Sequence, residues 1–148
     1  MELPLIPAPV AQARQDVPAA ASRPVRVLLV EDNPDTRALL EEALAMLSYQ
    51  VVSAESGEAA LRALAHSQVE AILADIGLPG IDGYEFLRRA RRMPSARQIP
   101  AFAVTGYGQD SDARHAFDAG FSGHFVKPVD LAALDRRVRQ ALGSSTAA

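Results

Sequence analysis

The chain contains no cysteine, and only one of its fifteen basic residues is a lysine. Without cysteine it has no disulfide framework and no thiolate metal site. No uncharged apolar run approaches the roughly 18 residues that span a membrane. The net charge of −3 gives no general reason to expect nucleic acid or an anionic membrane surface as a partner. We therefore expect a cytoplasmic protein that binds neither nucleic acid nor membrane.

The 148 residues fit one domain that is long enough to bury a core. Residues 1–24 hold five of the ten prolines and six alanines, and proline is excluded from helix interiors and central strands. We expect residues 1–24 to form a flexible Pro/Ala-rich arm, residues 25–142 the domain and residues 143–148 a polar tail. A secretory signal is not expected, because Glu2 and the early prolines interrupt the apolar region.

Five short apolar segments are predicted to be strands, and each precedes a segment with apolar residues at helical spacing. The predicted strands are 25–30, 50–54, 71–74, 100–104 and 123–127. The predicted helices are 34–47, 57–66, 82–92, 110–119 and 131–142. Unbroken apolar strands are typical of parallel sheets that helices cover on both faces. The fold class is therefore α/β, with a doubly wound five-stranded parallel sheet and five helices.

Several side chains on these helices are assigned to the core or to the surface. The apolar spacing of the first helix places Leu39 inward together with its leucine neighbours. The rings of Phe117 and Phe121 are interpreted as core. The basic cluster 88–92 is interpreted as a solvated helix end, where cations suit the negative end of the helix dipole, rather than as a nucleic-acid patch.

Polar residues stand where four of the five predicted strands end. Glu31 and Asp32 follow the first strand, Asp75 the third and Thr105 the fourth, while Lys127 ends the fifth. Taken singly, such a residue is more often a helix cap or a loop residue. However, ligands of doubly wound sheets bind outside the carboxyl ends of the strands, where all five would meet. This joint placement predicts a functional site.

The chemistry of these five residues favours phosphoryl transfer. Three carboxylates repel one another unless a cation neutralises them. Because the ligands are hard oxygens and no histidines form a spaced ligand pair, Mg²⁺ is the preferred ion. A carboxylate can attack phosphorus to form an aspartyl phosphate, with Thr105 and Lys127 contacting phosphoryl oxygens. The compact ammonium of the lone lysine suits that position better than a wide guanidinium.

Four motifs in the chain resemble the receiver domain of two-component response regulators. They are VEDN at 30–33, ADIGLPGIDG at 74–83, VTG at 104–106 and VKP at 126–128, in order within residues 25–142. The resemblance implies a flavodoxin-like fold with strand order 2-1-3-4-5. It also implies a phosphoacceptor switch that turns over no separate substrate and takes its phosphoryl group from a histidine kinase or a histidine phosphotransfer protein.

The resemblance further implies a role for each residue of the metal site. Asp75 would be the phosphorylated residue. Asp32 and Asp75 would contact Mg²⁺ directly, and Glu31 would hold the ion mainly through water. The backbone carbonyl of Gly77 would complete the protein ligands.

The switch residues follow from the same resemblance, with one departure. Thr105 would be the hydroxyl that moves toward the phosphoryl group, Lys127 would bind a phosphoryl oxygen, and the bond from Lys127 to Pro128 is expected to be cis. Family members usually carry Tyr or Phe three residues before this lysine, where the chain has His124. His124 is then a smaller switch, a group that responds to pH, or a surface residue without a switching role.

Other interpretations stay open at this point. A phosphorylation-independent interaction module would keep the fold without the chemistry. An aspartate-nucleophile phosphohydrolase would need a second Asp two residues after the nucleophile, where the chain has Gly77. The chain resembles stand-alone regulators and receivers of hybrid sensor kinases alike. Similar proteins dimerise or signal through their fourth helix, fifth strand and fifth helix, which makes this face the candidate for a homodimer.

Overall fold

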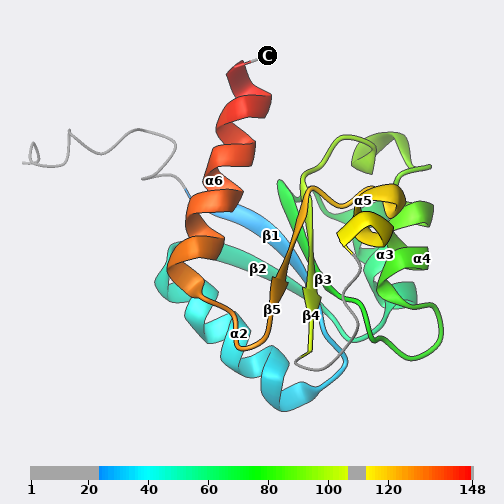
Figure 1. The fold of residues 1–148 in the computed structure, drawn as a ribbon, viewed down its shortest axis with the longest axis horizontal. Helices are drawn as coiled ribbons and strands as arrows, with labels where there is room; N and C mark the ends of the chain where they lie inside the picture. The colour runs from blue at the N-terminus through cyan, green and yellow to red at the C-terminus, as the bar shows by residue number, and fades with distance from the viewer. Residues whose placement is uncertain (1–23, 107–112, 148) are drawn as a thin grey trace, which may run out of the picture.

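The computed structural model describes residues 24–106 and 113–147 (Figure 1). The predicted arm therefore lies outside the described residues, except for Pro24. Five strands form one sheet in the order β2-β1-β3-β4-β5, and every neighbouring pair is parallel. The strands are β1 Val25–Val30, β2 Tyr49–Ala54, β3 Ala71–Asp75, β4 Ala101–Thr105 and β5 Gly123–Val126. The predicted flavodoxin-like topology is confirmed.

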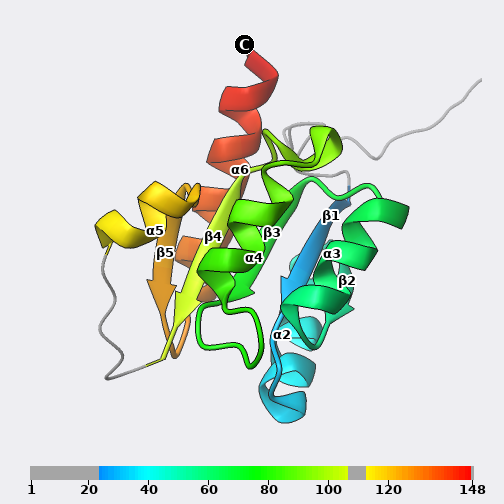
Figure 2. The same ribbon diagram turned by 90° about the vertical axis from the view of Figure 1, so that its right-hand side faces the viewer.

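Five helices cover the sheet. They are α2 Pro34–Met46, α3 Gly57–His66, α4 Gly83–Ala90, α5 Ala113–Ala119 and α6 Leu131–Ala147, and a short 3₁₀ turn, η3, spans Pro94–Ala96. Helices α3, α4 and α5 lie on one face of the sheet, and α2 and α6 lie on the other (Figures 1 and 2). None of the helices in the described ranges combines the length and the apolar character that crossing a membrane requires.

The two faces of the sheet bury separate apolar cores. Because side chains alternate between the faces of a strand, Leu28 and Val30 of β1 point toward α3 and α4, while Val27 and Leu29 point toward α2 and α6. Strand β3 is buried along its whole length, including Asp75. The apolar strand sequences thus fix the sheet between two helical layers, and the polar residues at their carboxyl ends are left at one edge.

Helix boundaries follow local capping chemistry. Asn33 caps α2, with its side chain accepting from the backbone N–H of Thr36 at 2.9 Å. Asp82 likewise caps α4, so it precedes that helix instead of starting it. The last helix extends past its predicted end at residue 142, because α6 continues to Ala147. Once a helix is formed, each further residue adds a hydrogen bond, and no proline interrupts this segment.

Two predicted core residues and one predicted surface cluster are also corrected. Leu39 is 67% exposed and Phe117 is 74% exposed, so neither belongs to the core. Leu40 and Leu44 carry the packing of α2, and Leu39 points away because consecutive helical residues are 100° apart. The basic cluster 88–92 is not uniformly solvated, since the half-buried guanidinium of Arg91 donates to three backbone carbonyl oxygens.

Candidate functional site

The strand ends bring the predicted residues to one edge of the sheet. Asp75 and Thr105 are the last residues of β3 and β4. Glu31 directly follows β1, and its backbone N–H donates to Ala54 at 3.0 Å. Lys127 directly follows β5, and its backbone N–H donates to the carbonyl of Thr105 at 2.8 Å. The site is therefore built from four neighbouring strands of a rigid sheet.

Three carboxylates form an acidic cluster at this edge, made of Glu31, Asp32 and Asp75. Each offers one oxygen, and these oxygens lie within 4.8 Å of one another. Glu31 is 2% exposed and Asp75 is 7% exposed, whereas Asp32 is exposed. The structure therefore brings these three carboxylates together, as the sequence predicts. Two buried carboxylates this close together need cationic or hydrogen-bonding partners.

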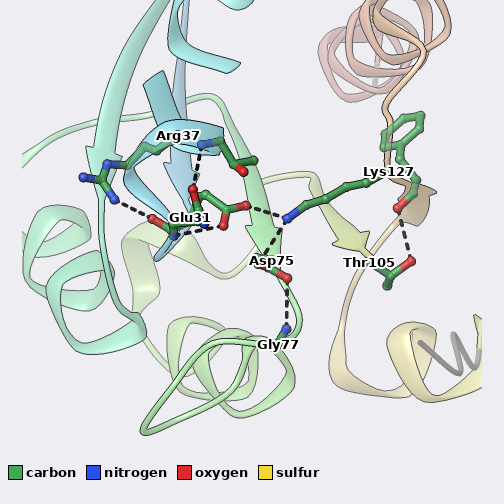
Figure 3. A network of polar contacts seen from close by, with 9 residues as sticks. Glu31, Arg37, Asp75, Gly77, Thr105 and Lys127 are labelled. Carbon is green, nitrogen blue, oxygen red and sulfur yellow. Dashed lines mark hydrogen bonds and ion pairs between the residues drawn. The ribbon is translucent and has the colours of Figure 1, made fainter. Parts of the chain in front are cut away.

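Lys127 supplies the cationic partner (Figure 3). Its Nζ donates to Glu31 Oε1 at 2.9 Å and to Asp75 Oδ2 at 3.4 Å. Burial raises the pKa of Glu31, and the hydrogen bond from Lys127 offsets part of that rise. Burial also acts to lower the pKa of Lys127, but its hydrogen bond to Glu31 and the charge of Asp75 outweigh this and raise the pKa above its ordinary value. Lys127 is therefore a firmly protonated ammonium.

Backbone N–H groups complete the pairing of the carboxylates. The N–H of Gly77 donates to Asp75 Oδ1 at 3.0 Å, and the N–H of Asn33 donates to Glu31 Oε2 at 3.1 Å. The Arg37 guanidinium donates to the backbone carbonyl of Glu31 at 2.9 Å and so braces the same turn. Sequence reasoning did not find Arg37, because its partner is a backbone oxygen that no side-chain pattern reveals.

The loop between β3 and α4 returns tightly against the end of β3. The N–H of Gly83 donates to the carbonyl of Ile76 at 3.0 Å. A Cβ atom on Gly83 would lie 2.5 Å from the carbonyl oxygen of Asp75 and 2.8 Å from the Cα of Ile76. Only glycine allows this approach. The sequence places Gly83 in the loop motif but does not show which backbone it touches.

The predicted switch residues Thr105 and His124 lie on the neighbouring strands β4 and β5. Thr105 is buried, and its hydroxyl donates to the carbonyl of Phe125 at 3.4 Å, as Figure 3 shows. His124, the adjoining residue of β5, is half-buried and lines a hollow of about 420 Å³ whose other walls include Phe117 and Phe121. The predicted cis bond between Lys127 and Pro128 is present.

Comparisons with known proteins agree with this geometry. The family model of the response regulator receiver domain matches residues 27–139. The chain is 35% identical over 114 residues to an uncharacterized 14.6 kDa protein of Leptolyngbya boryana, covering 77% of this chain and 87% of that one. It is 37% identical to the transcriptional regulatory protein AfsQ1 of Streptomyces coelicolor and 33% identical to the virulence sensor protein BvgS of Bordetella bronchiseptica. The matches cover 78% and 90% of this chain, but 50% of AfsQ1 and 11% of BvgS.

Solved structures show the same likeness. A putative response regulator from Chloroflexus aurantiacus has a TM-score of 0.76 and 33% identity, covering 82% of this chain and 99% of that chain. The receiver domain of the sensor histidine kinase PA1611 from Pseudomonas aeruginosa, which holds a magnesium ion in its active-site cleft, has a TM-score of 0.74 and 32% identity. That match covers 81% of this chain and 98% of the other.

The parallel sheet with helices on both faces, and with an acidic cluster and a lysine at its carboxyl edge, places the protein in the α/β class. The chain belongs to the response regulator receiver domain family of two-component signalling. Domains of this family are signalling switches rather than enzymes of the usual kind.

Proposed function

We propose that the protein is a phosphoacceptor switch in which Asp75 takes a phosphoryl group from a phosphohistidine. The arrangement around Asp75 carries the proposal. Its carboxylate ends a buried strand, accepts from Gly77 and Lys127, and stands beside Glu31 and Asp32. A nucleophile held between an ammonium and a cluster of metal-ligand oxygens is what in-line phosphoryl transfer requires.

The donor set of the site fits Mg²⁺. The acidic cluster offers only hard oxygens, and Mg²⁺ favours one or two carboxylates while keeping several waters. Asp32 and Asp75 are the proposed direct ligands. Glu31 would hold the ion mainly through water, and the carbonyl of Gly77 would complete the protein ligands. When bound, the ion supplies charge neutralisation for the transferred group.

In the proposed step, a carboxylate oxygen of Asp75 attacks the phosphorus of the phosphohistidine. The P–N bond breaks while the new P–O bond forms, and the imidazole leaves with its electron pair and takes up a proton. Lys127 Nζ already lies 3.4 Å from Asp75 Oδ2, so it is close enough to pair with a phosphoryl oxygen after transfer. We propose that the Thr105 hydroxyl then leaves the carbonyl of Phe125 and donates to the phosphoryl group.

The proposed partners follow from this chemistry. The proposed donor is a histidine kinase or a histidine phosphotransfer protein, and we propose a cytoplasmic location for the domain. Helix α5, strand β5 and helix α6 form the proposed homodimer face. The exposed apolar side chains of Phe117 and Val126 on this face support the proposal. The phosphohydrolase alternative is disfavoured, because Gly77 stands where such enzymes need an acid. A phosphorylation-independent interaction module is the remaining alternative.

Incubation with Mg²⁺ and acetyl phosphate, followed by intact-mass measurement, tests the proposal. Wild type should gain one phosphoryl group that is stable in acid and labile in base, and Asp75→Asn should gain none. Asp35→Asn is the matched control, since Asp35 is an exposed carboxylate of α2, and it should behave as wild type. A folded wild-type protein that stays unmodified would leave the interaction module as the better account. Rapid release of phosphate from small esters would favour the hydrolase.

A further inference from the structure

Helix α4 is built directly onto the backbone of the proposed phosphoacceptor. Its first residue, Gly83, donates to the carbonyl of Ile76 and leaves no room for a Cβ beside the carbonyl oxygen of Asp75. The loop before it begins at Gly77, whose N–H donates to Asp75 Oδ1. The loop is therefore tied to the Asp75 carboxylate at Gly77 and to the backbone of Asp75 and Ile76 at Gly83.

The next residue of α4 carries this connection to another helix. The ring of Tyr84 is 8% exposed and stacks on the imidazole of His115 in α5, with ring centroids 3.8 Å apart and planes at 9°. The edge of Phe121 contacts the same tyrosine ring at 6.5 Å and 76°. Figure 2 shows α4 and α5 as neighbours on one face of the sheet. Tyr84 thus joins the first turn of α4, which begins at Gly83, to helix α5.

The opposite end of α5 is fixed by different contacts. Arg91, which ends α4, donates from Nη2 to the carbonyl of Gly120 at 2.8 Å. The same guanidinium donates from Nη1 to Ala96 and Ile99 at 2.8 and 2.7 Å, so it is held on three sides. Gly120 has a φ of 112°, which favours glycine, and it ends the helix there. The carboxyl end of α5 is therefore anchored by the hydrogen bond from Arg91 to Gly120, while its amino-terminal half meets α4 through the ring stack.

We infer that the Tyr84–His115 stack transmits the state of Asp75 to α5, which turns about its anchored carboxyl end. This inference rests on the proposed phosphorylation of Asp75. A phosphoryl group adds charge and volume beside the Gly77 N–H, which displaces the loop that leads to Gly83 and Tyr84. A stacked aromatic pair shifts an equilibrium between two positions by roughly two- to tenfold. Tyr84 and His115 are positioning residues, because they act through the stack between α4 and α5 and not on the transferred group.

Hydrogen exchange of the segment 113–121 with and without acetyl phosphate and Mg²⁺ tests the inference, with intact mass measured on the same samples. The variants are Tyr84→Leu and His115→Ala, which remove the stack, and His115→Phe, which restores an aromatic ring. Asp118→Asn is the matched control, since Asp118 is an exposed side chain of α5 that takes no part in the stack.

All variants should form the phosphoryl adduct. Wild type, His115→Phe and Asp118→Asn should show a change of exchange in 113–121 on phosphorylation, and Tyr84→Leu and His115→Ala should lose it. If His115→Ala showed the same change of exchange in 113–121 as wild type, the proposed coupling through the stack would be overturned, and the proposed phosphorylation would still stand. Loss of the change in Asp118→Asn as well would also overturn it, since the effect would then not depend on the stack. Absence of the adduct from wild type would overturn the proposed function and this inference together.

Discussion

Replacement of Lys127 by methionine should destabilise the protein in a pH-dependent way. The substitution keeps the length of the side chain but removes the ammonium that donates to Glu31 Oε1 and Asp75 Oδ2. Breaking a buried ion pair costs about 3–5 kcal/mol. Lys127 is 27% exposed, so solvent screens part of this interaction. We expect a loss of about 1–3 kcal/mol in the free energy of unfolding at pH 8 without Mg²⁺.

The pH dependence follows from Glu31. Its pKa is already raised by burial, and the loss of Lys127 raises it further. A carboxyl whose folded-state pKa lies above the unfolded value favours folding at acid pH, and that contribution is lost as pH rises through the folded-state pKa. The free-energy difference between wild type and Lys127→Met should therefore be small near pH 4 and grow toward pH 8. Below the unfolded pKa, Glu31 is protonated in both proteins.

Urea unfolding at a series of pH values measures this difference. Arg88→Met is the matched control, because Arg88 makes an exposed ion pair with Glu85 on the surface of α4. The control should unfold at the urea concentration of wild type at each pH. A Lys127→Met protein as stable as wild type at pH 8, or a difference that does not vary with pH, would refute the assignment of Lys127 as the cation that neutralises Glu31.

Three further substitutions test the geometry of the site. Gly83→Ala should cost about 1–3 kcal/mol in urea unfolding, because its Cβ would meet the backbone of Asp75 and Ile76, and a change below that range would contradict the close approach. Asp32→Ala should weaken Mg²⁺ binding by at least about tenfold in calorimetric titration, and an unchanged affinity would exclude Asp32 as a direct ligand. Lys127→Arg keeps the charge but widens the cation, so phosphorylation should survive in part while the conformational response, measured by hydrogen exchange of β5, is lost, and a full response would show that the compact ammonium is not needed.

The sequence predicts the sheet and the cluster well for a physical reason. Strands buried on both faces are continuous apolar runs, and their order in a doubly wound sheet fixes which edge carries their carboxyl ends. Glu31, Asp75 and Lys127 therefore meet in space although they lie far apart in the chain. The cis bond before Pro128 was expected only from the resemblance, since no local pattern distinguishes it.

Other features depend on contacts that no local pattern encodes. The exposure of Phe117 depends on how α5, a short helix, packs on the sheet. The sequence position of a single aromatic residue in a helix does not show whether its ring faces the core or the solvent. Arg91 resembles its basic neighbours in sequence, yet its guanidinium binds backbone oxygens of two later segments. The stack of Tyr84 on His115 joins helices separated by a strand. Such contacts are set by side-chain rotamers and packing in three dimensions.

Locating the phosphoryl group after reaction with acetyl phosphate shows whether Asp75 is the phosphoacceptor. The phosphorylated protein is digested in acid, and the modified peptide is sequenced by mass spectrometry. The account predicts one modified residue, Asp75, and no adduct when Mg²⁺ is removed by a chelator. A phosphoryl group on another residue, or an adduct that forms equally well without Mg²⁺, would contradict the account.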